Sequence, residues 1–319
     1  MSESTDTPTV VLVHGGFADA SFWAPVIEDL QAHDVPVLAP PNPLRGLAHD
    51  AEYLASYVNQ LDGPVLLVGH SYGGAVISVA GASASNAVGL VYVAAFALDE
   101  GESFGEIFAE FGETPLVGAV RPSSYPLADG ETAVELTIAP ELYKEAFAAD
   151  LSDDAIRVLA VSQRPFAAIF EDRAEAAAWK TLPSWYAVAT SDNAIPPDAE
   201  RHMAQRMGAQ TIEVDASHSI ALSPGPTPSS GSSTPPSTRR PPRRSLDPRR
   251  RAAAPAASED NSRTLTSYMS RIARSPGTRT TMKSLSSGSE GLRPVEPKLV
   301  SLTIARRSPR KGSTLSIVT

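Results

Sequence analysis

The sequence predicts an α/β fold: a doubly wound, mostly parallel β-sheet with an inserted helical cap and a disordered C-terminal tail. Three observations support this prediction. Apolar runs rich in β-branched residues alternate with amphipathic stretches between residues 8 and 222. Only helical patterns occur from about residue 98 to residue 180. After Ser223 the chain is rich in Pro, Ser, Gly and Arg and loses its apolar periodicity, so it could not bury enough surface to offset chain entropy.

The apolar runs place the strands. They are apolar at successive positions, which suits a parallel sheet covered by helices on both faces, and strand–helix alternation is typical of doubly wound folds. The expected strands are residues 9–13, 35–39, 64–69, 88–94, 185–189 and 211–214. Helices are expected from an N-cap at Ser21 to Leu30, over about 48–61 and 72–82, and around Met203 and Met207. The predicted organisation is a first core part (1–97), a helical cap insertion (98–181), a second core part (182–222) and a basic tail (223–319).

The charges are divided unevenly along the 319 residues, whose formal net charge is −9. Of the 27 Lys and Arg residues 18 follow residue 222, but only 5 of the 36 Asp and Glu residues do, so the first part is near −22 and the tail near +13. The two parts are therefore interpreted separately. The absence of cysteine excludes disulfides, thiolate catalysis and cysteine-based zinc sites. Because the start does not resemble a signal peptide and no apolar stretch approaches ~20 residues, a soluble cytoplasmic protein is expected.

The segment Gly69-His70-Ser71-Tyr72-Gly73 matches the pattern G-x-S-x-G. It directly follows an expected strand and precedes an expected helix, which is the context of a nucleophile elbow. Its glycines permit a sharp turn that would lift the Ser71 hydroxyl above the sheet edge. The hydroxyl would also lie at a helix N-terminus, where backbone N–H groups favour developing negative charge. Ser71 is therefore the expected nucleophile, and the alternative is a glycine-rich turn without catalysis.

A serine nucleophile needs a base, and His218 is the expected one. It lies just beyond the last expected strand, late in the chain, as the order Ser, Asp, His requires. His70 adjoins the nucleophile on a tight turn that should point its side chain elsewhere, and His14 is expected to organise its own loop. The histidines expected on polar helix faces are His33, His49 and His202.

The base needs an anion that holds its tautomer and stabilises the imidazolium, and Asp192 is expected to supply it. This residue lies just past the strand at 185–189, at the right end of the sheet and in the right chain order. The rivals are Asp99, past the preceding strand, and Asp215, which should point along the end of its own strand. Alternatively, Asp192 caps the helix that begins near Pro197.

Two backbone amides are expected to bind the oxyanion of the tetrahedral intermediate. One is the N–H of Tyr72, the residue after the nucleophile. The other should come from Gly16 in the loop His14-Gly15-Gly16-Phe17, where the lack of a side chain would let substrate approach closely. The alternative is a plain glycine turn.

Four motifs together resemble those of a bacterial α/β-hydrolase family that is similar to plant methylesterases and hydroxynitrile lyases. They are HGGFADASFW from His14, GHSYGG from Gly69, SDNAIPP from Ser191 and DASHS from Asp215. The resemblance covers roughly residues 8–222. It implies an eight-stranded type of sheet, a helical cap over the site, no cofactor, and small carboxylic esters as substrates. It also implies a triad of Ser71, Asp192 and His218, with oxyanion amides from Gly16 and Tyr72.

The expected function is hydrolysis of a small carboxylic ester through an acyl-enzyme, with the ester and water as the partners. Phe17, Phe104 and Phe108 are the expected substrate contacts. The cap phenylalanines either shape the pocket or only fill the cap core: Phe104, Phe108, Phe111, Phe147, Phe166 and Phe170. No acidic cluster indicates a metal, and no glycine loop has a dinucleotide-binding spacing.

Two other functions use the same scaffold. A cyanohydrin-cleaving lyase of the related group would carry a lysine near the pocket, and the cap offers only Lys144 and Lys180, at no diagnostic position. An inactive ligand-binding protein is the other alternative, and the complete set of triad residues argues against it.

The resemblance ends after Leu222, where family members continue with one more amphipathic helix on the sheet. The abrupt change to Arg-, Pro- and Ser-rich sequence favours a reading-frame shift in a GC-rich gene. The alternative is a genuine basic tail that binds nucleic acid or acidic surfaces. Within the tail, helical spacing is found in one isolated stretch: Leu265, Tyr268, Met269 and Ile272. A missing helix would leave a sheet face uncovered near His218.

Overall fold

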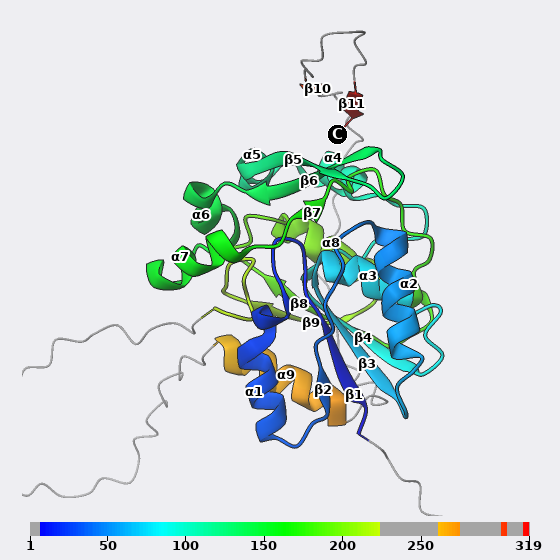
Figure 1. Ribbon diagram of the computed structural model, residues 1–319. Coiled ribbons are helices and arrows are strands. Elements are labelled where there is room, and N and C mark those ends of the chain that lie inside the picture. The colour runs from blue at the N-terminus through cyan, green and yellow to red at the C-terminus, as the bar shows by residue number, and fades with distance from the viewer. Residues whose placement is uncertain (1–6, 224–260, 275–300, 305–314, 319) are drawn as a thin grey trace, which may run out of the picture.

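A parallel sheet forms the centre of the protein. The structure is a computed structural model that describes residues 7–223, 261–274, 301–304 and 315–318 (Figure 1). Its main sheet has the strand order β2-β1-β3-β4-β8-β9, and every neighbouring pair is parallel. In that spatial order the strands are Val37–Leu38, Thr9–Val13, Val65–Ser71, Ala87–Ala95, Ser184–Ala189 and Gln210–Val214. The expected strands and the mostly parallel sheet are thus confirmed, and this main sheet has six strands among the described residues where the resemblance implied eight.

Helices cover both faces of the sheet because side chains alternate along each strand. In β1, Val10 and Leu12 are buried in one apolar cluster and Val11 and Val13 in another. The first cluster includes side chains of α1 and α9, and the second includes side chains of α2, α3 and α8. These helices are Ala24–Ala32 (α1), Asn261–Arg274 (α9), Leu47–Val58 (α2), Tyr72–Ala80 (α3) and Pro197–Arg206 (α8). The predicted double winding is therefore confirmed.

The first helix begins differently from the prediction. A 3₁₀ turn, η1 (Ala20–Trp23), precedes α1, and the N-cap of this turn is Asp19. The Asp19 carboxylate accepts hydrogen bonds from the Ser21 backbone N–H at 2.8 Å and from the Ser21 hydroxyl at 2.6 Å. The prediction of Ser21 as the cap was wrong, because a carboxylate two positions earlier takes that role.

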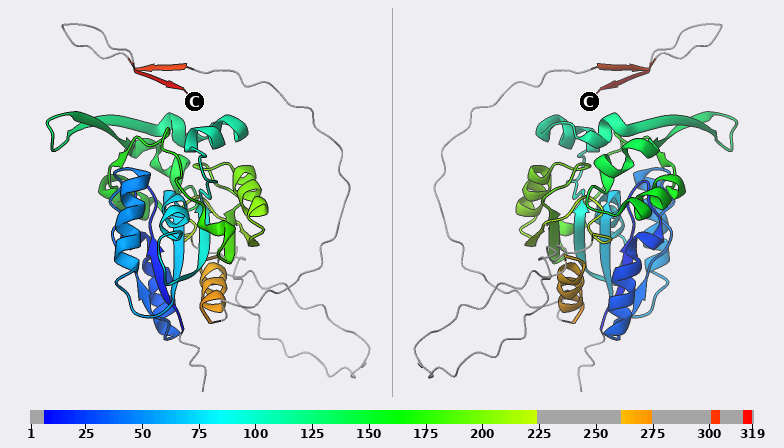
Figure 2. Two further views of the ribbon diagram at one scale, coloured as in Figure 1. Left: turned by 90° about the vertical axis from the view of Figure 1, so that its right-hand side faces the viewer. Right: turned by 90° about the vertical axis from the view of Figure 1, so that its left-hand side faces the viewer.

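The cap lies over the carboxyl ends of the parallel strands (Figures 1 and 2). It is not only helical, as the sequence suggested: an antiparallel sheet of β5 (Val120–Pro126), β6 (Thr132–Ile138) and β7 (Phe166–Ala167) forms part of it. In β6 the alternate residues Leu136 and Ile138 are buried, a period of two that short cap segments made hard to recognise. The cap helices are α4 (Phe104–Phe111), α5 (Pro115–Ala119), α6 (Tyr143–Phe147) and α7 (Asp153–Ser162), with the 3₁₀ turns η2 (Pro140–Leu142) and η3 (Ala178–Lys180).

Helix α9 occupies a place on the sheet beside α1 (Figure 1). Leu265 and Met269 are fully buried, and Ile272 is nearly so, in the same cluster as the strands of that face. The Tyr268 hydroxyl donates to the Gln210 carbonyl at the start of β9. The stretch predicted to be isolated and disordered thus forms a helix packed on the sheet, and this face is not left uncovered. In the rest of the tail that was predicted to be disordered, residues 301–304 and 315–318 form strands instead, and residues 224–260, 275–300, 305–314 and 319 lie outside the described residues.

Two further observations complete the description. The strands β10 (Ser301–Ile304) and β11 (Leu315–Val318) pair antiparallel with each other. Among the described residues, no helix combines the length and the apolar character that crossing a bilayer requires.

Candidate active site

Ser71 lies at a strained turn between β3 and α3. Its backbone has φ 54° and ψ −124°, a region that non-glycine residues rarely adopt. A Cβ on Gly69 would lie 2.5 Å from the Gly73 carbonyl oxygen, and one on Gly73 would lie 2.4 Å from the Val13 carbonyl oxygen. Only glycine fits at either position, and the resulting turn has the conformation of a nucleophile elbow.

Asp192 and His218 meet in the loops that follow β8 and β9. The His218 Nδ1–H donates to Asp192 Oδ2 at 2.6 Å, and both side chains are buried. The other carboxylate oxygen accepts from the backbone N–H groups of Ala194 at 2.6 Å and Ile195 at 2.8 Å. With Nδ1 protonated, His218 Nε2 is left as the basic nitrogen.

The Nε2 atom of His218 is buried, and none of the described residues forms a hydrogen bond with it. His218 therefore forms no bond to the Ser71 hydroxyl. Ser71 and His218 nevertheless lie in the same region, because the ring of His70, the residue before Ser71, lies 4.7 Å from the His218 ring between centroids. Such nucleophile–base bonds are often long in a protein without substrate.

His70 bonds to the backbone of His218. Its Nε2–H donates to the His218 carbonyl at 2.9 Å, and its ring stacks on Phe22 at 4.1 Å between centroids. Burial lowers the pKa of His70 well below its usual range, so the ring is neutral. The side chain of His70 is thus engaged away from the Ser71 hydroxyl, as predicted, but its bond to His218 was not predicted.

His14 is a buried loop residue, as expected. Its Nδ1–H donates to the Gly15 carbonyl at 2.9 Å, and its Nε2 accepts from the Asn42 backbone N–H at 3.0 Å. Burial lowers the pKa of His14 to about 4. His33 and His49 are exposed, whereas His202 packs against Phe111 at 5.2 Å between ring centroids.

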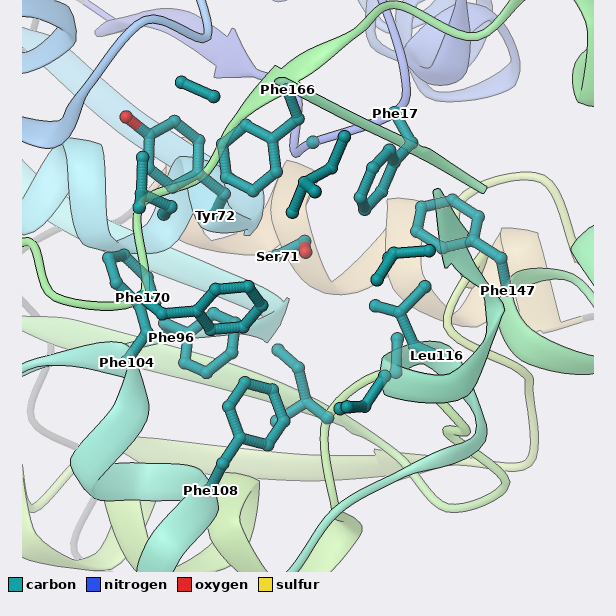
Figure 3. Close-up of a pocket in the computed structure, with 18 residues that line it drawn as sticks. Phe17, Ser71, Tyr72, Phe96, Phe104, Phe108, Leu116, Phe147, Phe166 and Phe170 are labelled. Atoms are coloured by element: carbon teal, nitrogen blue, oxygen red, sulfur yellow. The ribbon is translucent and has the colours of Figure 1, made fainter. Parts of the chain in front are cut away.

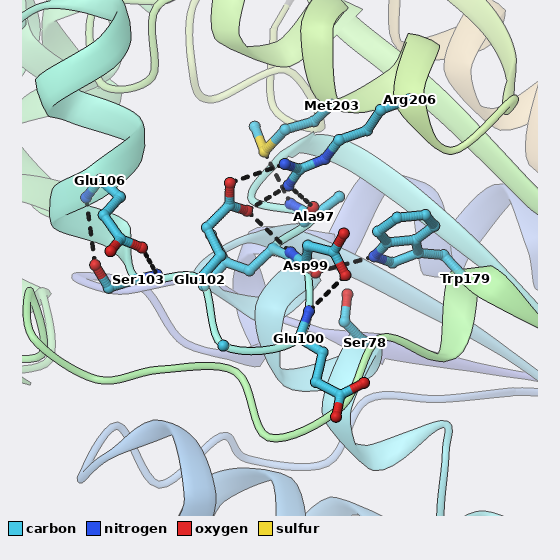
Figure 4. Close-up of polar contacts among 12 residues, drawn as sticks. Ser78, Ala97, Asp99, Glu100, Glu102, Ser103, Glu106, Trp179, Met203 and Arg206 are labelled. Atoms are coloured by element: carbon cyan, nitrogen blue, oxygen red, sulfur yellow. Dashed lines mark hydrogen bonds and ion pairs between the residues drawn. The ribbon is translucent and has the colours of Figure 1, made fainter.

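The rival acids have other partners. Asp99 forms an ion pair with Lys180. Where the chain enters the cap, Asp99 also accepts from the Glu100 backbone N–H (Figure 4). Asp215 accepts from the Ser191 hydroxyl at 3.4 Å. Of the three candidate acids, Asp192 is the one bonded to His218.

The glycine loop after β1 packs directly against the elbow. A Cβ on Gly15 would lie 2.6 Å from the Ser71 Cβ, so the loop approaches the nucleophile closely. A Cβ on Gly16 would instead lie 2.8 Å from Cδ1 of Phe166, so the missing side chain makes room for this cap ring. Among the described backbone bonds outside the helices and strands, none is donated by Gly16 N–H or Tyr72 N–H.

The side chain of Tyr72 is held by a buried carboxylate. The Tyr72 hydroxyl donates to Asp50 Oδ2 at 2.8 Å, and Asp50 also accepts from the Arg45 backbone N–H. Because Asp50 belongs to α2, this bond fixes the first residue of α3 against the neighbouring helix.

An apolar cavity opens onto Ser71 beneath the cap (Figure 3). It encloses about 620 Å³, including its open mouth, and carries no charged side chain on its wall. The expected substrate contacts Phe17, Phe104 and Phe108 lie on this wall, together with Gly16 and Tyr72. The remaining aromatic rings on the wall are Phe96, Phe147, Phe166 and Phe170, of which Phe96 escaped the sequence analysis because it lies just before the cap. Phe111, also suggested for the pocket, is not on the wall.

The sequence profile of a protein family described as the alpha/beta hydrolase family matches residues 10–227. The chain belongs to this α/β-hydrolase family. Among curated proteins no relative matches the sequence significantly. Solved structures with the same fold include polyneuridine aldehyde esterase, with 20% identity and a TM-score of 0.60 over 68% of this chain and 94% of that one.

Two further structures have similar folds. A pyrethroid hydrolase from Sphingobium faniae JZ-2 is 20% identical, with a TM-score of 0.54 over 66% of this chain and 90% of that one. An extracellular α/β-hydrolase from a Paenibacillus species is 21% identical, with a TM-score of 0.53 over 67% of this chain and 93% of that one. At these identities the likeness shows the fold alone.

One buried acid of this α/β-hydrolase was missed by the sequence analysis. Glu200 on α8 is fully buried, and its Oε2 accepts from the Ala189 backbone N–H at 3.2 Å. A lone Glu in a polar helix carries no sequence signal for burial, because the helix otherwise has the composition of a solvated surface. Among the described residues, no cluster of His, Asp and Glu has the arrangement of a metal site.

Proposed function

We propose that this α/β-hydrolase is a serine esterase that cleaves small, neutral carboxylic esters through an acyl-enzyme. The observation that carries the proposal is the 2.6 Å bond between His218 Nδ1 and Asp192, beside a nucleophile elbow that opens into an apolar cavity. A bonded acid and base next to a strained serine is the arrangement needed to activate a hydroxyl.

In the proposed reaction, Ser71 Oγ attacks the ester carbonyl while His218 Nε2 takes the hydroxyl proton. Asp192 stabilises the imidazolium, and the N–H groups of Gly16 and Tyr72 bind the oxyanion. The imidazolium then protonates the leaving alcohol, and the acyl group remains on Ser71. Water, deprotonated by His218, attacks the acyl-enzyme and releases the acid. Closure of the Ser71–His218 contact on substrate binding is part of this proposal.

The cavity wall supports a neutral, apolar substrate. A charged acyl or alcohol group would lose its hydration among phenylalanine rings without gaining a partner, since the described wall offers no charge. The two cap lysines do not favour a lyase, because Lys144 pairs with Asp153, Lys180 pairs with Asp99, and neither lines the cavity.

The test is active-site labelling followed by hydrolysis assays. A fluorophosphonate probe should label Ser71, as mapped by digestion and mass spectrometry, and the label should be lost in Ser71→Ala and His218→Ala. Ser71→Ala should lower turnover of p-nitrophenyl acetate by about 10⁵–10⁶. Esters with a carboxylate on the acyl chain should react more slowly than neutral esters of equal length. Labelling elsewhere, or turnover that survives Ser71→Ala, would refute the proposal.

A further inference from the structure

Two carboxyl groups share one buried site behind the base. Glu200 and Asp192, the acid bonded to His218, are both buried and both bond to Ala189, whose N–H donates to Glu200 at 3.2 Å and whose carbonyl accepts from the Asp192 N–H at 3.3 Å. Two ionised carboxylates in contact without solvent are unstable, so one of the pair has to hold a proton.

The hydrogen bonds decide which carboxyl holds the proton. Asp192 accepts from three N–H groups, those of Ala194, Ile195 and His218 Nδ1. Glu200 accepts from one, the Ala189 backbone N–H, and its Oε1 is buried without a donor among the described residues. Three donors stabilise an anion better than one, so the negative charge belongs on Asp192. A protonated Glu200 becomes a donor, and the neighbouring Asp192 carboxylate is an acceptor for it.

The other titratable groups near Glu200 are bonded elsewhere, and the charge of Arg201 is the weakest influence on its pKa. Arg201, the next residue on α8, directs its guanidinium to Glu213 and Asp198 on the exposed side. Tyr186 from β8 bonds the Ala95 backbone through its hydroxyl. Burial, and then the charge of Asp192, raises the pKa of Glu200 well above its usual range.

We propose that Glu200 is a neutral carboxylic acid whose O–H donates to Asp192, and that it acts as a positioning residue for the triad acid. The bond holds the Asp192 carboxylate charged and aimed at Nδ1–H, which in turn keeps Nε2 of His218 as the base. The kinetic consequence rests on the proposed esterase function, whereas the protonation itself does not.

The first test measures protonation through stability. Glu200→Gln keeps a donor toward Asp192 and an acceptor for Ala189, but cannot lose a proton. In the wild type the folded state holds a proton that the unfolded state releases near pH 4.5, so stability falls as pH rises above that value. The melting temperature of Glu200→Gln minus that of the wild type should therefore increase between pH 4.5 and 8. The exposed Asp198→Asn on the same helix is the control and should show no such increase. A difference for Glu200→Gln that is constant with pH would overturn the proposal.

The second test measures the role in positioning. Glu200→Leu has a similar volume without a donor, and loss of a hydrogen bond to a charged acceptor should lower kcat/KM for p-nitrophenyl acetate about ten- to a hundredfold. The acidic limb of its pH–rate profile should move to higher pH, because a less solvated Asp192 binds the imidazolium more strongly. Glu200→Gln should retain near wild-type kinetics. Equal impairment of both variants, or wild-type activity of a folded Glu200→Leu, would overturn the positioning role. If no variant or wild type hydrolyses esters, the esterase proposal fails while the stability test still decides the protonation.

Discussion

Truncating Leu265 should destabilise the hydrolase core although this residue lies far beyond the last strand in the sequence. Leu265 is fully buried where α9 packs on the sheet, in one cluster with Met269, Ile220 and Ala221. Leu→Ala at a fully buried site typically costs about 2–5 kcal/mol. For a domain of this size about 1 kcal/mol corresponds to roughly 2–4 °C, so the melting temperature should fall by roughly 5–15 °C.

The cost has a ceiling set by the docking of α9 itself. If Leu265→Ala removes more free energy than docking contributes, the helix detaches and further truncations add nothing. A Leu265→Ala/Met269→Ala double variant should then have the same melting temperature as a chain that ends at Ser223. Detachment should also affect turnover below the melting temperature, because Ile220 and Ala221 follow His218 within three residues and pack in the cluster that α9 completes.

The assay is thermal unfolding followed by circular dichroism, with urea unfolding as a second measure. Arg271→Ala is the matched control: it removes a larger side chain from the exposed side of the same helix and should change stability by no more than about 0.5 kcal/mol. The reasoning is wrong, and α9 is not docked, if Leu265→Ala has the same melting temperature as Arg271→Ala and the chain ending at Ser223 has the same melting temperature as the full chain.

Three further perturbations test the site. Burial lowers the pKa of His14 to about 4, so below about pH 6.5 the unfolded state takes up a proton that the folded state does not. About 2–3 kcal/mol of the free energy of unfolding should therefore be lost as pH falls from about 6.5 to about 4.5. His14→Gln should not show this loss in urea titrations at the two pH values. Gly16→Ala should lower kcat/KM, since its Cβ meets the Phe166 ring at 2.8 Å, and Phe166→Ala in the same chain should restore part of the activity. Asp192→Asn should lower turnover about 10⁴-fold with little loss of fold by circular dichroism, because the amide favours the wrong tautomer of His218; a small effect would remove Asp192 from the triad.

The parts of the site that could be predicted from sequence are those with local signals. Ser71 is flanked by glycines between an apolar strand and a helix, and the strained φ of 54° is what those glycines accommodate. Asp192 and His218 each follow an apolar strand, and parallel strands bring such positions to one edge of the sheet. Chain order and strand ends were therefore enough to predict that these two side chains lie close together.

The cap could be predicted only in part because its strands carry weak signals. β5 is mostly exposed and contains two prolines, Pro122 and Pro126, which are typical of edge strands and read as loop. In α9 the helical spacing was visible, but residues 215–260 separate it from β9 in the sequence, and periodicity does not say where a distant helix packs. Both errors concern long-range pairing, which local composition does not encode.

Glu200 was missed for a different reason, and it shows where the sequence is least informative about the site. Nothing in the helix distinguishes Glu200 from its exposed neighbour Asp198, yet one side chain is fully buried and the other pairs with Arg201 near solvent. The distinction arises from the 100° rotation between successive helix positions, which turns Glu200 toward β8 and Asp192. A carboxyl group turned inward survives in a core only if it is neutral or paired. Its burial beside Asp192 therefore implies a proton, and the pH dependence of stability is the observable that reveals it.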